Sequence, residues 1–398
     1  MKNIRVPYAK SVHGQEEIDA VLEVLNSSTQ MGKKTIELEK KVSEIFDKKF
    51  GIMTNSGSSA LYLAMDILGF NKGSEVITPA LTFSTTVASL VKSDLIPNFV
   101  DINHKTFCID ENKIEEKINS KTKAILVPDL LGSLCNWPKI KEIADKYNLK
   151  ILQDSADTLG AKINNLSSGF YSDMSITSFY GSHVINGAGN GGMLCVNDKK
   201  ESEKAKLLRS WGRSSSLYED SEAIENRFGT NLDGIRYDAK FIFQELGYQL
   251  EPSEISSAFA LIQLKNLEVN INKRIANFEI HQTFFKKYKE FFDLPQELEG
   301  SYSGWLAYPL IVKEEAPFSR TDLQIFLEEK NIQTRVIFTG NILRQPGFKN
   351  IKCKGKADDF KSADYVMKGG ILLACHHGLN QEMINHMHKS VVNFLGKI

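Results

Sequence analysis

Two short stretches of the chain combine residue types that could do chemistry together. Ile151–Asp154 begins with apolar residues and ends in a carboxylate, as expected of a buried strand that reaches a site. Further along, Ser178 and His183 stand five residues apart, ahead of a bend with glycines at 187, 189, 191 and 192. A carboxylate can hold a pyridine nitrogen protonated, a hydroxyl can bind phosphate, and an imidazole can move a proton near neutral pH. These residue types suit a phosphorylated pyridine cofactor.

A serine- and glycine-rich segment at 55–59 precedes a predicted helix at 60–68. A helix N-terminus presents N–H groups and the positive end of the helix dipole, and both favour a phosphate. Taken alone, such a segment is more often an ordinary N-cap. Next to Asp154 and Ser178, it favours a phosphate site.

The elements that must position these residues alternate between strands and helices. Strands are expected at 51–54, 75–78, 97–101, 124–128, 151–154 and 175–179, with a returning strand at 193–196; helices are expected at 16–26, 35–48, 60–68, 85–92, 113–118 and 140–147. This alternation predicts an α/β fold with a mostly parallel sheet covered on both faces. In such sheets ligands bind beyond the carboxyl ends of the strands, where residues 56–58, Phe83, Asp154 and Ser178 fall.

The second half of the chain has a different pattern. Residues 209–250 form a long polar stretch with embedded aromatic residues, which favours an ordered loop that lines a site. A helical segment at 252–288 follows, and then a strand at 307–312, a helix at 321–330, a strand at 332–337 and a helix at 381–394. We therefore expect a large domain at 1–265 and a smaller α+β domain at 266–398.

The turn from Ser178 to His183 resembles that of the sugar aminotransferases, which have the aspartate-aminotransferase fold (fold type I) and use pyridoxal 5'-phosphate. The resemblance implies a three-layer sandwich around a mostly parallel sheet. In that family a lysine stands five residues after the serine and holds the cofactor covalently. Here the position is His183, and no lysine occurs between Lys162 and Lys199. An imidazole has no primary amine, so it cannot hold the cofactor in this way, but it can act as a base.

Four segments resemble the nucleotide-sugar 3-dehydratases more specifically: Asp154–Ala161, Trp211–Arg213, Thr334–Phe348 and Ala363–Met367. The resemblance covers nearly the whole chain. It implies that Gly57, Ser58 and Ser178 bind the cofactor phosphate, that Phe83 stacks on the ring, that Asp154 pairs with its nitrogen, that Ala156 packs beneath it, and that His183 is the catalytic base. It places Arg335, Asn341 and Arg344 near the sugar nucleotide. From the residues alone, Phe83 is almost as readily a core side chain, and both arginines could be surface charges.

The chain departs from this resemblance at two places. One branch of these dehydratases carries a two-iron cluster on cysteines just after the Trp-Gly-Arg turn, where this chain has Ser214–Ser216. Because hydroxyls do not replace thiolates on such clusters, we expect a protein without an iron–sulfur cluster. The family usually has an asparagine where Gln249 stands, and that asparagine reaches the cofactor phosphate of the other subunit. Gln249 is therefore a cofactor-binding candidate whose cross-subunit contact stays open.

Composition excludes several other classes of protein. Lys+Arg and Asp+Glu are both 49, which disfavours nucleic acid or an anionic membrane as a partner. The five cysteines form no close pairs, and the start of the chain has no apolar signal region, so a cytoplasmic protein is expected. His376 and His377 are adjacent and lack an evident third ligand, so no metal site is predicted.

The sequence thus predicts a 3-dehydratase that uses pyridoxamine 5'-phosphate and acts on an NDP-4-keto-6-deoxyhexose. Glutamate would renew the cofactor amine, and the protein would be a homodimer. The alternatives are an ordinary nucleotide-sugar aminotransferase, a dehydratase coupled to a reductase, and an inactive family member that serves as a binding protein. The missing lysine disfavours the aminotransferase, and the missing cysteines disfavour the reductase-coupled dehydratase. The intact set of Gly57, Asp154 and Ser178 disfavours the inactive binding protein.

Overall fold

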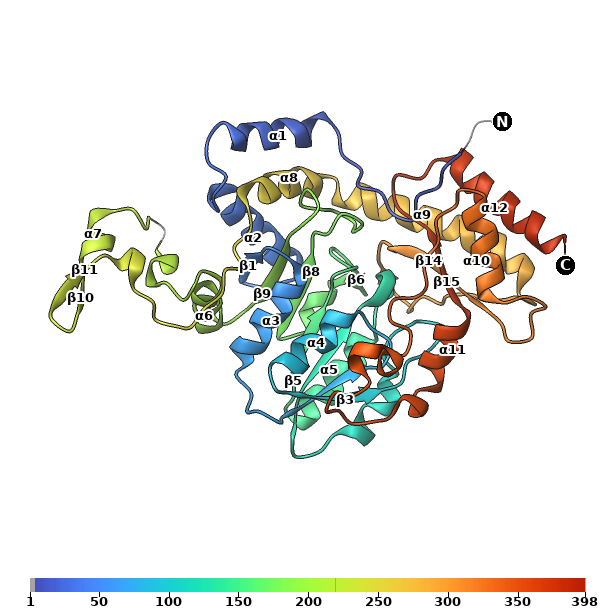
Figure 1. Ribbon diagram of the computed structural model, residues 1–398, viewed down its shortest axis with the longest axis horizontal. Coiled ribbons are helices and arrows are strands. Elements are labelled where there is room, and N and C mark those ends of the chain that lie inside the picture. The colour runs from blue at the N-terminus through green and yellow to red at the C-terminus, as the bar shows by residue number, and fades with distance from the viewer. Residues whose placement is uncertain (1–3, 219, 398) are drawn as a thin grey trace.

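A computed structural model of the protein describes residues 4–218 and 220–397. At its centre lies a seven-stranded sheet in the order β1-β9-β8-β5-β4-β2-β3 (Figure 1). Its strands are β1 (Phe50–Thr54), β2 (Glu75–Pro79), β3 (Ile96–Val100), β4 (Thr122–Pro128), β5 (Lys150–Asp154), β8 (Met174–Ser178) and β9 (Gly192–Val196). β9 runs antiparallel to both of its neighbours, and the other pairings are parallel. The mostly parallel sheet and the returning strand predicted from the sequence are confirmed.

Alternate side chains of the strands enter separate cores on the two faces of this sheet. In β4, Leu126 packs in a core with Leu61, whereas Val127 packs in a core with Trp137. Helices α3 (Gly57–Leu68), α4 (Ser84–Lys92) and α6 (Lys199–Arg209) cover the first face, and α2 (Lys33–Ile45), α5 (Trp137–Tyr147) and α8 (Glu254–Lys265) cover the second. The result is the predicted three-layer sandwich.

The second half of the chain builds a smaller unit with an antiparallel sheet, β12-β14-β15. Its elements are β12 (Phe292–Asp293), β14 (Ala307–Val312), β15 (Gly370–Ala374), α9 (Leu267–Phe285), α10 (Arg320–Glu329), α11 (Lys361–Gly369) and α12 (Gln381–Leu395). A short sheet of β6 (Lys162–Ile163), β7 (Leu166–Ser167) and β13 (Ser301–Tyr302) joins it to the larger unit. Val6 packs in the core of the smaller unit and forms a bridge with Ile332. The division at 265/266 stays a prediction.

Two predicted elements are wrong, and several others were missed, among them α6. The segment 113–118 is not an α-helix but part of two single-turn 3-10 helices, Glu111–Lys113 and Glu115–Lys117. The segment 332–337 makes isolated bridges rather than a strand, and β15 pairs with β14 in its place. Both wrong assignments concern six-residue windows, in which a short apolar pattern carries little information. β15 and α11 were missed.

Helix α1 (Gln15–Leu25) packs on α8, but the expected apolar face does not point inward. Ile18, Leu22 and Leu25 are 45%, 50% and 55% exposed, whereas Glu17 and Val24 are buried. The apolar face of α1 is therefore on the surface of the single chain. No helix in the described part of the chain is long and apolar enough to cross a membrane.

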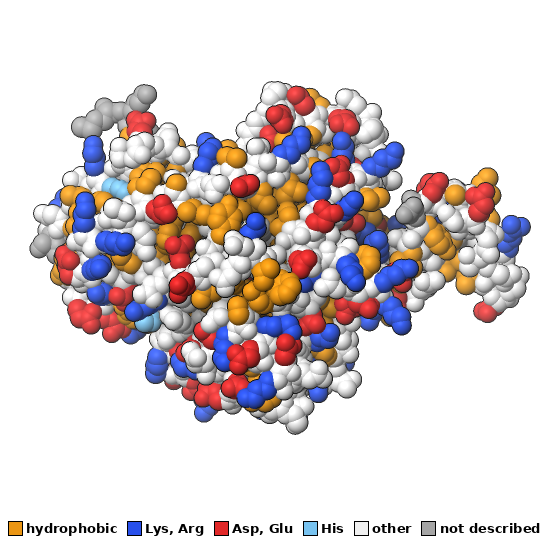
Figure 2. All heavy atoms as spheres, turned by 180° about the vertical axis from the view of Figure 1, so that it is seen from behind, with side chains coloured by type: hydrophobic (Ala, Val, Ile, Leu, Met, Phe, Trp, Pro, Cys, Tyr) orange, Lys and Arg blue, Asp and Glu red, His pale blue; other side chains and the backbone are white. Residues whose placement is uncertain are grey.

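The described residues of 217–248, here called the arm, project away from the body of the molecule (Figure 1). The arm contains α7 (Ile224–Phe228) and a hairpin of β10 (Thr230–Leu232) and β11 (Ile235–Tyr237). It exposes apolar side chains, and Leu246 is 98% exposed; Figure 2 shows hydrophobic side chains on its surface. None of its described residues lines the cavity described below, so the expected site-lining role does not hold within one chain.

Candidate active site

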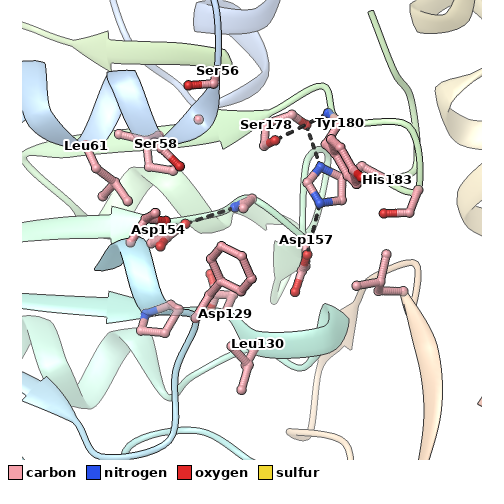
Figure 3. Close-up of a pocket in the computed structure, with 18 of the residues that line it drawn as sticks. Ser56, Ser58, Leu61, Asp129, Leu130, Asp154, Asp157, Ser178, Tyr180 and His183 are labelled. Atoms are coloured by element: carbon pink, nitrogen blue, oxygen red, sulfur yellow. Dashed lines mark hydrogen bonds and ion pairs between the residues drawn. The ribbon is translucent and has the colours of Figure 1, made fainter. Parts of the chain in front are cut away.

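A cavity of about 370 Å³ lies at the carboxyl ends of β4, β5 and β8, the edge where such sheets bind ligands (Figure 3). Its lining residues are Tyr8, Ser56, Gly57, Ser58, Leu61, Phe83, Thr85, Pro128, Asp129, Leu130, Asp154, Ala156, Asp157, Ile176, Ser178, Tyr180, Ser182, His183, Asn190, Gly191, Leu306 and Phe338. The predicted site residues among them are Gly57, Ser58, Phe83, Asp154, Ala156, Ser178 and His183.

The start of α3 and the end of β8 form one wall of the cavity. Ser56 is the N-cap of α3, and its Oγ accepts a hydrogen bond from the Ser59 N–H at 3.1 Å. A Cβ on Gly57 would lie 2.8 Å from the Ser178 Cβ, so a glycine is needed for the strand end to come this close. The helix start and the Ser178 hydroxyl together offer what a phosphate requires: N–H donors, a hydroxyl and the positive end of a dipole.

Asp154 ends β5 at the floor of the cavity, and its side chain is fixed by two donors. Thr86 Oγ1 donates to Oδ2 at 2.8 Å, and the Ala156 N–H donates to Oδ1 at 3.3 Å. Burial, and next the negative charge of Asp157, raise the pKa of Asp154 to about 6. A buried carboxylate of this kind gains from a cationic partner, which a protonated pyridine nitrogen would supply.

His183 lies across the cavity from Asp154, on the turn that follows β8 (Figure 3). Its Nδ1 lies 2.9 Å from the Ser178 carbonyl oxygen. Because a carbonyl can only accept, Nδ1 carries the hydrogen, and Nε2 is the unprotonated atom of the neutral ring. The sequence fixes this geometry locally, since the turn brings the ring back onto the carbonyl of the residue five positions earlier.

Asp157 faces His183, with its Oδ1 3.4 Å from Nε2. Burial lowers the pKa of His183 to about 4 and raises the pKa of Asp157 to about 6, because it disfavours both charged forms. The facing carboxylate opposes this effect on His183, since an unprotonated Nε2 and an ionised carboxylate repel each other. A proton taken up by Nε2 would lie between the ring and this carboxylate, so the pair is placed to accept a proton from a ligand and return it.

Phe83 and Ala156 both line the cavity. Phe83 precedes α4 as its N-cap and remains 50% exposed, so it is not a core residue. Its ring makes an edge contact with Phe338 at 5.9 Å between centroids. Both rings are available to contact a planar ligand.

The other predicted site residues do not line the cavity. Gln249 is exposed at the base of the arm, where it bridges to Ser210. Asn341 is buried, and its Nδ2 donates to the Ala357 carbonyl and to Asp364 Oδ1, each at 2.8 Å.

The two predicted arginines also lie outside the lining. Arg344 pairs with Asp358 at 2.8 Å and with Asp364 at 2.6 Å. Arg335 is exposed, with its guanidinium 5.5 Å from the centroid of the Tyr8 ring. Arg335 therefore lies next to a residue of the cavity lining.

Several lining residues were not predicted from the sequence, among them Tyr8, Asp157, Tyr180 and Phe338. Asp157 carried a usable signal, because it is a second carboxylate three residues after Asp154, just beyond the same strand end. Tyr8 carried none, since only the pairing of the N-terminal segment with residues 331–333 brings it there.

Comparison with known proteins identifies relatives over almost the full length. A model described as the DegT/DnrJ/EryC1/StrS aminotransferase family matches residues 12–392. The chain is 32% identical to the lipopolysaccharide biosynthesis protein RfbH of Salmonella typhimurium, covering 98% of this chain and 92% of that one. It is 31% identical to the GDP-4-keto-6-deoxy-D-mannose 3-dehydratase of Yersinia pseudotuberculosis, covering 99% of each.

Among solved structures, a GDP-4-keto-6-deoxymannose-3-dehydratase with a trapped PLP-glutamate geminal diamine is similar, with a TM-score of 0.86 at 28% identity. The match covers 97% of this chain and 99% of that one. The predicted fold and the predicted resemblance are thereby confirmed. On the match that spans residues 12–392, the chain belongs to the DegT/DnrJ/EryC1/StrS aminotransferase family.

Proposed function

We propose that this protein is a pyridoxamine 5'-phosphate-dependent 3-dehydratase that removes the C3 hydroxyl of an NDP-4-keto-6-deoxyhexose. The observation that carries the proposal is that His183 lines the cavity, at the position where aminotransferases of the family have their lysine. No lysine is among the described residues that line the cavity. The Yersinia relative is named for this reaction on a GDP-linked sugar, which makes GDP the first nucleotide to test.

The residues of the cavity fit the cofactor at both of its polar ends. Ser178 and the start of α3 would hold the phosphate. They can approach each other this closely because Gly57 has no Cβ. Asp154 would hold the ring nitrogen, since it is buried and otherwise bonded only by neutral donors. Phe83 and Ala156 would bracket the ring.

The proposed mechanism assigns the proton transfers to His183. When bound, pyridoxamine phosphate would supply an amine to condense with the C4 ketone and a ring to take up the electrons left by proton removal and return them to expel the C3 hydroxyl. His183 Nε2 takes a proton from the carbon that bears this amine, because Nδ1 is occupied with the Ser178 carbonyl. The resulting imidazolium, stabilised by Asp157, donates a proton to the departing C3 hydroxyl. Hydrolysis releases the 3-deoxy-4-ketosugar and ammonia.

The cofactor amine is renewed from glutamate in this proposal, without an iron–sulfur cluster. The similar dehydratase structure that contains a PLP–glutamate species supports glutamate as the donor. At the position of the cluster cysteines, Ser214 begins a 3-10 helix and donates its hydroxyl to the Ala239 carbonyl at 3.2 Å. Transfer of the glutamate amine supplies the two electrons that removal of the hydroxyl consumes.

A second copy of the chain is proposed to complete the site. The lining contains Asp129, Asp154 and Asp157 and, among described residues, no lysine or arginine. A sugar nucleotide and a cofactor phosphate bring several negative charges, which require cations from outside this lining. The arm and the apolar face of α1 expose hydrophobic side chains in the single chain, and such exposed surfaces usually bind a partner. A homodimer would cover these surfaces, and Gln249 of one copy would reach the cofactor phosphate of the other; being neutral, Gln249 does not supply the cations, which have to come from other side chains.

The decisive experiment is turnover of GDP-, CDP- and dTDP-linked 4-keto-6-deoxyhexoses with glutamate. The expected products are a 3-deoxy-4-ketosugar, ammonia and 2-oxoglutarate in equal amounts. A 4-amino sugar that retains its C3 hydroxyl would instead identify an aminotransferase, and turnover of none of the sugars would favour an inactive binding protein.

A further inference from the structure

Helix α9 carries a row of polar side chains on its buried side, at 270, 274 and 277. Asn270, Arg274 and Asn277 are 7%, 0% and 9% exposed, although they stand at the spacing that usually carries apolar residues of a packed helix. A charged group is costly to bury unless all its donors find acceptors. The hydrogen-bond partners of these three side chains should therefore explain why they are buried.

Arg274 uses all five of its N–H groups. Nη2 donates to the carbonyls of Ser182 at 3.1 Å and His183 at 3.0 Å, and Nη1 to those of Trp305 at 3.0 Å and Leu306 at 3.2 Å. Nε donates to His377 Nδ1 at 3.3 Å. A guanidinium has five donors, fixed in one plane, so this residue has no donor left for a ligand.

Asn270, one helical turn before Arg274, extends the same contact. Its Nδ2 donates to the Val184 carbonyl at 3.1 Å. Three consecutive carbonyls of the turn that carries His183, at 182, 183 and 184, therefore bind to α9. Asn277 donates to the carbonyls of Cys375 and His376, at 3.4 and 3.0 Å, and does not contact this turn.

We propose that Arg274, assisted by Asn270, is the positioning residue for His183, because it fixes the backbone of the His183 turn against residues 305–306 and His377. The role of this turn in proton transfer rests on the proposed function. The buried position of His377, adjacent in sequence to a second histidine, is explained as the acceptor for Arg274 Nε rather than as part of a metal pair.

The charge of Arg274 also bears on the same site. Burial lowers the pKa of Arg274 to about 10, so the guanidinium stays protonated at neutral pH. Its positive charge adds to burial in lowering the pKa of His183, and it lowers the pKa of Asp157 against the larger effect of burial. The residue thus holds the turn in place while favouring the neutral, proton-accepting form of His183.

The test compares four variants: Arg274→Met, Arg274→Lys, Asn270→Ala and Asn277→Ala. Asn277→Ala is the matched control, because it removes a buried amide from the same face of the same helix without touching the turn. The first readout is hydrogen–deuterium exchange of the peptide that covers residues 180–187, measured on the full-length protein with cofactor. The second is the steady-state kinetics of dehydration.

We expect Arg274→Met to speed exchange in this peptide about tenfold or more and to lower kcat about 10²-fold, with the KM for the ketosugar little changed, since misplacement of a reacting group acts on the chemical step. Arg274→Lys should restore part of both, and Asn270→Ala should show a smaller effect of the same kind. Asn277→Ala should leave the peptide and kcat as in the wild type.

A wild-type rate of hydrogen exchange at 180–187 in a folded Arg274→Met protein would overturn the proposal. An increase of this rate in Asn277→Ala equal to that in Arg274→Met would also overturn it. If Arg274→Met does not fold, Arg274→Lys and Asn270→Ala decide by the same criteria. If the wild type dehydrates none of the sugars, the proposed function fails, and the exchange data still decide whether Arg274 fixes the turn.

Discussion

Replacement of Gly57 by alanine is expected to weaken cofactor binding by closing the space between α3 and β8. The added Cβ would lie 2.8 Å from the Ser178 Cβ and 3.3 Å from its Oγ. In the free protein, the Ser178 side chain and strand end can shift to relieve this contact. With a phosphate bound, the Ser178 hydroxyl must stay at the cradle, so the strain falls mainly on the bound state. Overpacking of this kind costs about 1–3 kcal/mol, which corresponds to roughly 5-fold to 140-fold weaker binding.

The assay is titration of cofactor-free protein with pyridoxamine phosphate, followed by protein fluorescence. Gly181→Ala is the control, because a Cβ there would meet no atom within 4 Å although the residue lies in the neighbouring turn. We expect wild-type affinity for Gly181→Ala and a thermal midpoint for Gly57→Ala within a few degrees of the wild type. Wild-type affinity of a folded Gly57→Ala protein would refute the assignment of this wall to the phosphate.

Four further predictions concern the cofactor and the chemistry. Borohydride treatment with pyridoxal phosphate should leave no pyridoxyl adduct on the 163–198 peptide of the wild type, whereas His183→Lys should turn yellow and be labelled there. Both His183→Lys and the colourless His183→Asn should dehydrate about 10²-fold more slowly or worse; an Asn variant at the wild-type rate would exclude His183 as the base. Burial raises the pKa of Asp154 to about 6, so its carboxylate is lost as pH falls through 6. The affinity of the wild type for pyridoxamine phosphate, relative to Asp154→Asn, should therefore fall between pH 7 and 5, and a constant ratio would contradict the ring contact; this ratio cancels titration of the cofactor itself. Finally, with Ser214–Ser216 in place of cysteines, the isolated protein should contain no stoichiometric iron and turn over with glutamate alone, and a strict need for a reductase would contradict this.

The parallel part of the fold was predictable because its signals are local and repeat. Each strand of the central sheet has an apolar run, and β1, β2 and β4 are followed by helices α3, α4 and α5, whose apolar side chains cover the sheet. The residues at the strand ends, Asp154 and Ser178, were predictable for the same reason, since a parallel sheet brings its carboxyl ends to one edge. Gly57 follows from the same logic at the start of a helix.

What the sequence did not reveal depends on contacts between distant segments. Tyr8 lines the cavity because Val6 pairs with residues 331–333, and no local sequence pattern near Tyr8 indicates this pairing. The helical spacing of the apolar residues of α1 was recognised correctly, but these side chains point away from the core of the same chain. Asn341 and Arg344, which the resemblance assigns to the substrate, share Asp364 as a polar partner within the single chain, and their assignment to the substrate stays a prediction.

The exchange of lysine for histidine at position 183 changes the demands on the scaffold as well as the chemistry. A lysine reaches its target through four rotatable bonds, so its backbone can lie within a tolerant range of positions. A histidine has only two side-chain torsions, and the location of its ring is therefore set by the backbone of the turn. In this chain the Ser178 carbonyl fixes the tautomer and orientation of His183, and α9 fixes three carbonyls of the turn. If His183 is the base, a stiff side chain of this kind depends on a stiff support, and for this reason we assign Arg274 and Asn270 of α9 to positioning His183 rather than to the core.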